Sequence, residues 1–227
     1  MTMENVTLLR LLQLASPSLP IGAYTYSQGL EAAIESGRVT DENSARAWIT
    51  ESLAVVADFE APVLWRLLKA FSVRDMAAVT YWTECFIAAR DTAEFRAETI
   101  QMGYSLAKLV ADLKIADDAL LEILTSQPEI PLPTAFACAA EALSVPHEAA
   151  LLGMLFSMAE NQVLACVKSV PLGQVSGQRL LFSLHPVLED TSNYAQHLGD
   201  DELSNWAPGL SLLSMQHEVQ YSRIYRS

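Results

Sequence analysis

PHEAALLGMLFSMAENQVLACVKSV, residues 146–170, is the most strongly patterned stretch of the chain. Small and apolar residues recur in it at alternating intervals of three and four: Ala149, Leu152, Phe156, Ala159, Val163, Cys166 and Val170. This spacing is the period of an α-helix, and the leucines and methionines between these positions make the other faces apolar as well. A helix that is apolar on most sides is buried, so we expect it to be the central helix of the fold. It should end near Ser169, before Pro171 and Gly173.

Shorter segments with the same period surround this one. They predict helices close to residues 6–15, 28–36, 42–59, 63–71, 75–89, 91–113, 117–124, 134–143, 174–184, 186–194 and 208–215. The first should bury a stripe made of Leu8, Leu11, Leu12 and Ala15. Gly103 predicts close helix packing, because a mid-helix glycine costs about 1 kcal/mol relative to alanine. Since no segment alternates with a period of two and no long linker divides residues 1–227, we predict an all-α, single-domain, irregular bundle of about ten helices.

The composition narrows the class of protein. The chain has 227 residues, of which 51% are hydrophobic, so it can bury a sizeable core. Its formal net charge of −13 opposes binding to nucleic acid or anionic lipid, since each phosphate contact needs a cation. The three cysteines, Cys85, Cys138 and Cys166, lie in apolar patterns without a CxxC, which predicts reduced core thiols. With no signal segment and a longest apolar run, 149–159, well short of the ~20 residues that cross a bilayer, we expect a cytoplasmic protein without a membrane partner.

The motifs of several enzyme classes are missing from the sequence. It contains no GxxxxGK[ST] phosphate loop, no GxGxxG after a strand and no GxSxG elbow. His217 begins a run similar to the zinc motif HExxH, but Tyr221 replaces the second histidine. One catalytic alternative is that Asp117 and Asp118 hold Mg²⁺ in an all-α prenyl-diphosphate enzyme. The attraction of acidic residues to a helix N-terminus explains the same pair without catalysis.

A second stretch, residues 11–31, reads LLQLASPSLPIGAYTYSQGLE and interrupts the helical pattern. Its two prolines cannot both lie inside one regular helix, so the first helix must end here. Tyr24 and Tyr26 bring large rings with polar tips to the bend that follows. We call residues 17–29 the aromatic corner and expect function to lie there.

The chain closes on HEVQYSRIYRS, residues 217–227. Chain ends are usually featureless, yet this one is rich in tyrosine and arginine, the residues enriched at binding hot spots. We expect residues 217–227, like residues 1–5, to be a mobile terminus that becomes ordered when a partner binds. Docking of this segment on the chain's own core is the alternative.

Three segments, 12–31, 166–174 and 217–227, resemble in sequence and order the UreF family of urease accessory proteins. The resemblance implies an all-α homodimer that is not an enzyme and holds no cofactor. It implies a place between the accessory protein UreD or UreH and the nickel-binding GTPase UreG, in a chaperone complex that delivers nickel to apo-urease. UreD or UreH would order the C-terminal segment, and the assembled dimer would recruit UreG. A helical adaptor unrelated to nickel is the other non-catalytic alternative.

The resemblance also implies roles for single residues. Tyr24 and Arg223 match positions tied to forming the complex and recruiting the GTPase. Further partner-binding positions in the matching segments are Tyr26, Gln28, Glu31, Lys168, Gln174, Tyr221 and Tyr225. His217 and Glu218 match a family pair that would touch passing nickel without forming a tight metal site. Lys168 also stands out physically, because a lysine at the end of an apolar helix is costly unless it is paired or exposed.

Overall fold

The computed structural model describes residues 3–226, and the outermost positions of the two termini expected to be mobile, residues 1–2 and 227, lie outside that description. The described residues form α-helices and two 3₁₀ turns, without a strand. The helices are α1 (Asn5–Leu14), α2 (Leu30–Glu35), α3 (Glu42–Asp58), α4 (Glu60–Ser72), α5 (Met76–Ala88), α6 (Ala93–Asp112), α7 (Asp118–Thr125), α8 (Leu132–Ala142), α9 (His147–Ser169), α10 (Gln174–Ser183), α11 (His185–His197) and α12 (Pro208–Glu218). The turns are η1 (Ala23–Thr25) and η2 (Asp200–Glu202). The predicted all-α, single-domain fold is confirmed, with twelve α-helices in this part of the chain rather than about ten.

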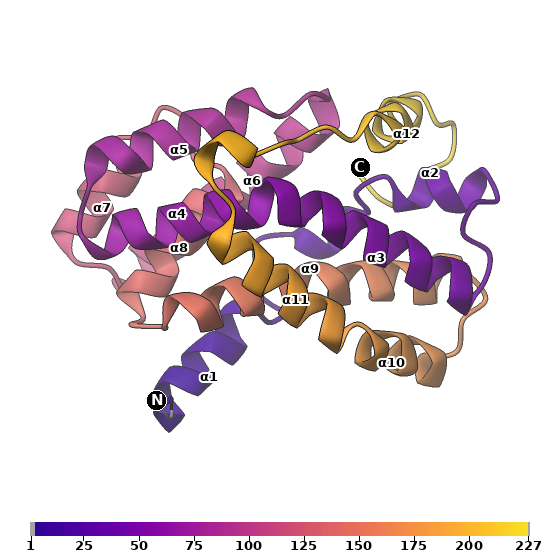
Figure 1. The fold of residues 1–227 in the computed structure, drawn as a ribbon, viewed down its shortest axis with the longest axis horizontal. Coiled ribbons are helices and arrows are strands. Elements are labelled where there is room, and N and C mark those ends of the chain that lie inside the picture. Colours follow the sequence, from indigo (N-terminus) through magenta and orange to yellow (C-terminus); the bar gives the residue numbers. More distant parts are fainter. Residues whose placement is uncertain (1–2, 227) are drawn as a thin grey trace.

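The helix α9 is the centre of the bundle, as the sequence predicted. It contacts α1, α2, α3, α4, α8, α10, α11 and η1. Figure 1 shows α3 alongside it, α10 and α11 along one edge, and α4 to α8 gathered at one end. The helix ends at Ser169, where Val170 takes up an extended conformation before Pro171. One buried cluster that runs through all of these helices forms the hydrophobic core.

Local sequence signals account for several helix ends. The side chain of Asp41 accepts a hydrogen bond from Ser44 N–H, which completes a capping box at the start of α3. Thr92 caps α6 and Asp117 caps α7 by accepting from the N–H three residues further on. Gly37, at a φ of 73°, follows the end of α2 in the left-handed conformation that glycine favours. These caps satisfy backbone groups that a helix leaves unpaired at its ends.

The contact between α6 and α8 depends on Gly103. The α8 helix is lined with alanine and is buried along almost its whole length, so other helices can cross it closely. A side chain at position 103 would overlap the carbonyl oxygen of Ile130 and the backbone of Pro131, which lead into α8. The close packing predicted from the mid-helix glycine is therefore confirmed.

The first helix differs from its prediction. The expected buried stripe is only partly buried: Leu8 and Leu12 are exposed, whereas Leu11 packs against the core and Leu14 is buried. The reason is visible in Figure 1, where α1 projects from the edge of the bundle and only its C-terminal part lies on α9. Helical spacing identified the helix correctly but did not show which of its leucines meet the domain.

The central helix α9 is long and apolar enough to cross a membrane, judged by length and composition alone. The apolar run seen in the sequence was shorter because Glu160, Asn161 and Gln162 interrupt it. More than half of the most apolar window is buried inside the domain, which is how a core helix meets the same criterion.

The cysteine thiols are largely buried. Burial raises the pKa of the Cys138 and Cys166 thiols to about 12. All three cysteines are free, as predicted, although Cys85 is only half-buried.

Substitution of Gly103 by alanine should destabilise the fold. The added methyl group would meet backbone atoms, which cannot rotate away, so we expect Gly103→Ala to lower the free energy of unfolding by about 1–3 kcal/mol. Gly209→Ala is the matched control, because Gly209 lies in α12 with no atom within 4 Å of the added group. Urea unfolding of both variants checks the prediction, and equal stabilities would contradict it.

Candidate interaction site

The aromatic corner is held in a strained backbone conformation. Gly22 and Gly29 have φ values of 80° and 79°, in the left-handed region that glycine tolerates. Gln28 also has a positive φ of 54°, which is uncommon for a residue with a side chain. Its side chain donates a hydrogen bond to Glu98 at 2.8 Å and accepts one from Gln162 at 3.3 Å. These interior contacts hold the bend between η1 and α2 in place.

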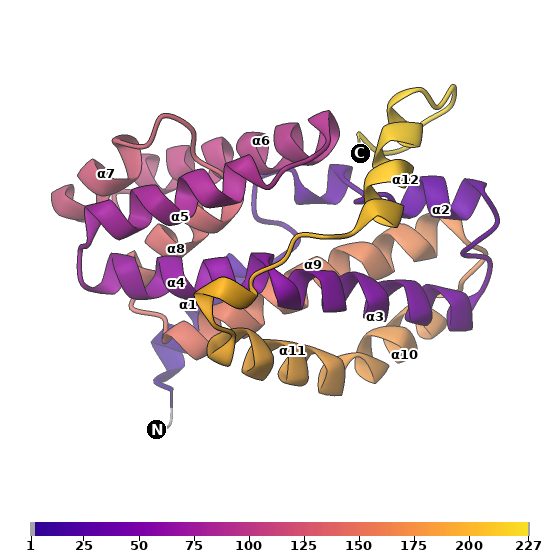
Figure 2. The same ribbon diagram turned by 45° about the horizontal axis from the view of Figure 1, so that its top comes forward.

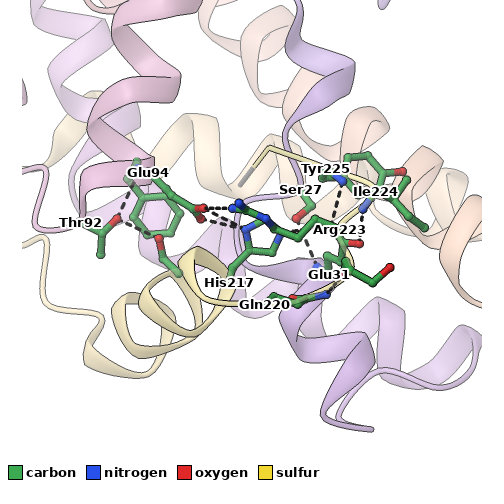
Figure 3. A network of polar contacts seen from close by, with 12 residues as sticks. Ser27, Glu31, Thr92, Glu94, His217, Gln220, Arg223, Ile224 and Tyr225 are labelled. Atoms are coloured by element: carbon green, nitrogen blue, oxygen red, sulfur yellow. Dashed lines mark hydrogen bonds and ion pairs between the residues drawn. The ribbon is translucent and has the colours of Figure 1, made fainter.

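The carboxylate of Glu31, in the first turn of α2, is the centre of the site. One oxygen accepts a hydrogen bond from the Ile224 N–H at 2.7 Å. The other accepts from the Tyr225 N–H at 2.9 Å and lies 3.0 Å from Nε2 of His217. Glu31 is buried, and Figure 3 shows the three contacts converging on it. Hydrogen bonds to an ionised group are among the stronger ones in proteins, so this carboxylate ties the end of the chain to α2.

His217 lies fully buried between two carboxylates. Its Nδ1 is 3.0 and 3.1 Å from the two oxygens of Glu94 on α6, while its Nε2 faces Glu31. Because an ionised carboxylate only accepts hydrogen bonds, this geometry is satisfied when both ring nitrogens carry a proton. The guanidinium of Arg223 donates to Glu94 at 3.1 Å. Two carboxylates therefore meet two basic side chains, and α2, α6 and α12 are joined at this point (Figure 3).

We call residues 219–226, which follow α12, the tail. In this structure the tail docks on the domain. The Arg226 N–H donates to the carbonyl oxygen of Thr25 at 2.8 Å, so the tail also touches the aromatic corner. Tyr225 is buried, which raises the pKa of its hydroxyl, and Nζ of Lys168 lies 5.9 Å from its ring centroid. The three segments that resemble the UreF family thus meet in one place.

The structure divides the predicted partner-binding residues into two groups. Tyr24 is 55% exposed, and Lys168, Gln174, Tyr221 and Arg223 are also exposed. Tyr26, Glu31 and Tyr225 are buried and Gln28 is half-buried. As docked, the second group holds the site together and does not present a surface to a partner. Gln174 stands apart: it begins α10, and no hydrogen bond joins it to the corner or the tail among residues 3–226.

The structure bears on two expectations about the C-terminal segment. His217 and Glu218 belong to α12, and His217 is fully buried as docked. Both ring nitrogens of His217 face carboxylates, and Glu218 is exposed, so transient contact of this pair with nickel stays a prediction. Whether residues 219–226 are mobile in solution stays a prediction.

Several residues of the site were not predicted from the sequence. Glu94 lies at the start of the helix predicted near residues 91–113 but was not assigned to the site, and Glu98 and Asn161 were not singled out. Asn161 donates to two carbonyls of the aromatic corner, and a signal for it was present: a polar trio, residues 160–162, interrupts the otherwise apolar α9.

The Mg²⁺ alternative at Asp117 and Asp118 gains no support from the geometry. Asp117 accepts the Leu120 N–H at 2.8 Å, and this bond lowers the pKa of the Asp117 carboxyl. Its other oxygen pairs with Arg74 at 3.2 Å. Over residues 3–226, no group of three or more His, Cys, Asp or Glu side chains is placed to hold a metal ion. Capping of α7 therefore explains this acidic pair.

Removal of the Glu31 carboxylate should be costly. Glu31→Ala leaves two backbone N–H groups and His217 without their acceptor, so we expect a loss of about 3–5 kcal/mol in the free energy of unfolding. Glu35→Ala, at an exposed position of the same helix, should change it by less than about 0.5 kcal/mol. Urea unfolding measures both, and similar values for the two variants would show that Glu31 does not anchor the tail.

Comparison with known proteins agrees with the resemblance. The family model described as UreF matches residues 39–185. A urease accessory protein UreF from Nitrosospira multiformis is 76% identical over 224 residues, covering 99% of both chains. The protein of that name from Janthinobacterium sp. is 72% identical over 226 residues, covering 99% of this chain and all of the relative, and that from Azoarcus sp. is 48% identical over 227 residues. With matches that extend through the aromatic corner and the tail, the chain belongs to the UreF family of urease accessory proteins.

Proposed function

We propose that this protein is a cytoplasmic, non-catalytic scaffold for urease activation. It binds UreD or UreH, recruits the GTPase UreG, and so helps nickel to reach apo-urease. Nickel is the cargo of the assembled complex, and the scaffold itself needs no cofactor. The observation that carries this proposal is the junction at Glu31, which ties the tail to α2, next to the aromatic corner, while Tyr24 and Arg223 stay exposed.

The tail and α12 offer an apolar surface for UreD or UreH. Leu212 and Met215 of α12 and Val219 at its C-cap are exposed and follow helical spacing. Two further apolar side chains, Tyr221 and Ile224 in the tail, are also exposed. We call these five residues the α12 stripe. Figure 2 shows α12 and the tail standing out from the bundle beside α2. Exposed apolar groups gathered on one segment are typical of protein interaction sites. The resemblance links this segment to UreD or UreH, and its exposed apolar groups support capture by that partner.

The aromatic corner and Arg223 supply a polar contact for UreG. The ring of Tyr24 is exposed on η1, and the tail reaches the carbonyl of the next residue, Thr25. Arg223 is held by Glu94 while 40% of its side chain stays exposed. Tyrosine and arginine are the residues most enriched at interface hot spots, so this pair supports recruitment of a second protein.

The exposed face of α1 supports a homodimer. Val6, Leu9 and Leu12 are exposed there, and the helix has no acidic residue in a chain whose net charge is −13. Its single charged side chain, Arg10, donates to the Leu143 carbonyl at 3.0 Å. A second copy of the same face can therefore approach without repulsion between carboxylates, as a twofold interface requires.

Charge placed on this face should separate the dimer. We expect Leu12→Asp to shift the protein to monomer, because two carboxylates would face each other or lose water on pairing. Leu113→Asp is the control, since Leu113 is 53% exposed and Leu12 is 58% exposed. Light scattering after size-exclusion chromatography gives the mass of each variant. A dimer that survives Leu12→Asp would exclude the α1 face.

The partner assignments can be tested by capture from cells that express the urease genes. A chain that lacks residues 219–227 should keep its helical circular dichroism signal and fail to bind UreD or UreH. Arg223→Ala and Tyr24→Ala should still bind UreD or UreH but recruit UreG with an affinity lower by about thirty-fold, the lower end for loss of a charged interface contact.

Matched variants control for general surface effects. Arg179→Ala removes an arginine that is 65% exposed and pairs with Glu42, much as Arg223 pairs with Glu94. Tyr104→Ala removes a tyrosine that is 63% exposed on α6. Both should recruit UreG normally. Unchanged capture by the shortened chain, or equal losses in the matched variants, would contradict the proposed assignments.

A further inference from the structure

Asn161 reaches the aromatic corner from the middle of the central helix α9. Its Nδ2 donates hydrogen bonds to the carbonyl oxygens of Ala23 at 3.1 Å and Tyr26 at 2.9 Å. Ala23 is the first residue of η1 and Tyr26 is the residue after its end, so the two carbonyl groups flank Tyr24. A side-chain amide carries two hydrogens, and a single residue of the rigid interior can therefore hold both sides of the turn.

The carbonyl groups of the corner show what else holds it. The Gly22 oxygen accepts from the N–H and the hydroxyl of Thr25, which are contacts within the turn itself. The Thr25 oxygen accepts from Arg226, which belongs to the tail. Asn161 therefore provides two hydrogen bonds from the central helix to the turn, one to η1 and one to the residue after it, whereas Arg226 reaches the turn from the tail.

The neighbour of Asn161 holds the other end of the corner. Nε2 of Gln162 lies 3.3 Å from the side-chain oxygen of Gln28, whose backbone has the positive φ of 54°. A residue persists in such a conformation only where its surroundings fix it. Two consecutive residues of α9 thus hold the corner on both sides of Tyr24.

We propose that Asn161 is the positioning residue that presents Tyr24 to a partner. This inference rests on the proposed function, because it names the residue through which the corner acts. Asn161 is partly buried and works through the backbone of η1 rather than by touching the partner. Loss of two neutral hydrogen bonds should weaken recruitment through Tyr24 by about tenfold.

The first test measures the corner itself, without any partner. Asn161→Leu keeps a similar side-chain size and removes both donors, and it is made in the full chain. Amide hydrogen exchange at Thr25 and Tyr26, which donate within the turn, should become about tenfold faster, while exchange along α9 stays unchanged. Glu160→Gln is the control, since it alters the adjoining position of α9 and should leave exchange in the corner as it is.

The second test asks whether Asn161 acts through Tyr24. Recruitment of UreG should fall about tenfold in Asn161→Leu, and the double variant with Tyr24→Ala should bind no more weakly than Tyr24→Ala alone. Unchanged exchange at Thr25 and Tyr26, or losses that multiply in the double variant, would overturn the inference. If the unaltered protein recruits no UreG, the proposed function is contradicted, and the exchange measurement by itself decides whether Asn161 holds the corner.

Discussion

The carboxylate of Glu31 binds a ring nitrogen and two backbone amides that lie 186 to 194 residues further along the chain. A buried carboxylate without partners is costly, and so is a buried backbone N–H without an acceptor. Each side of this junction therefore stabilises the other. Glu94 and Arg223 complete the network, so that two acidic and two basic side chains meet at one point, with Arg223 partly open to solvent. The position of the tail, and the surface that it helps to form, depend on this arrangement.

The junction separates an inner support from an outer surface. On the inner side, Asn161 and Gln162 of α9 hold the aromatic corner by hydrogen bonds. The helices packed around α9 restrict its movement. On the outer side, Tyr24, Arg223 and the α12 stripe remain exposed. A scaffold needs both properties, because a partner gains affinity when the groups that it binds are already in place. Tyr26 and Tyr225 are buried in the docked conformation, and their predicted contact with a partner stays a prediction.

Local patterns in the sequence predicted the helices well, because helical period, prolines and capping residues act over a few positions. The end of α9 at Ser169, the cap at Asp41 and the close approach at Gly103 all follow from such signals. The pairing of His217 with Glu31 and Glu94 could not be predicted, since it depends on how α2, α6 and α12 meet. Spacing also could not tell exposed from buried leucines in α1, or exposed Tyr24 from buried Tyr26, because each pair satisfies the same local pattern.

Amide hydrogen exchange of the unbound protein measures whether the tail is docked on the domain in solution. Ile224 and Tyr225 donate to Glu31, and Arg226 donates to Thr25. If the tail is docked in solution, these three amides exchange much more slowly than those of an unstructured peptide with the same sequence. Exchange of all three at the rate of that peptide, while the amides of α9 stay protected, would show that the junction at Glu31 does not hold the tail.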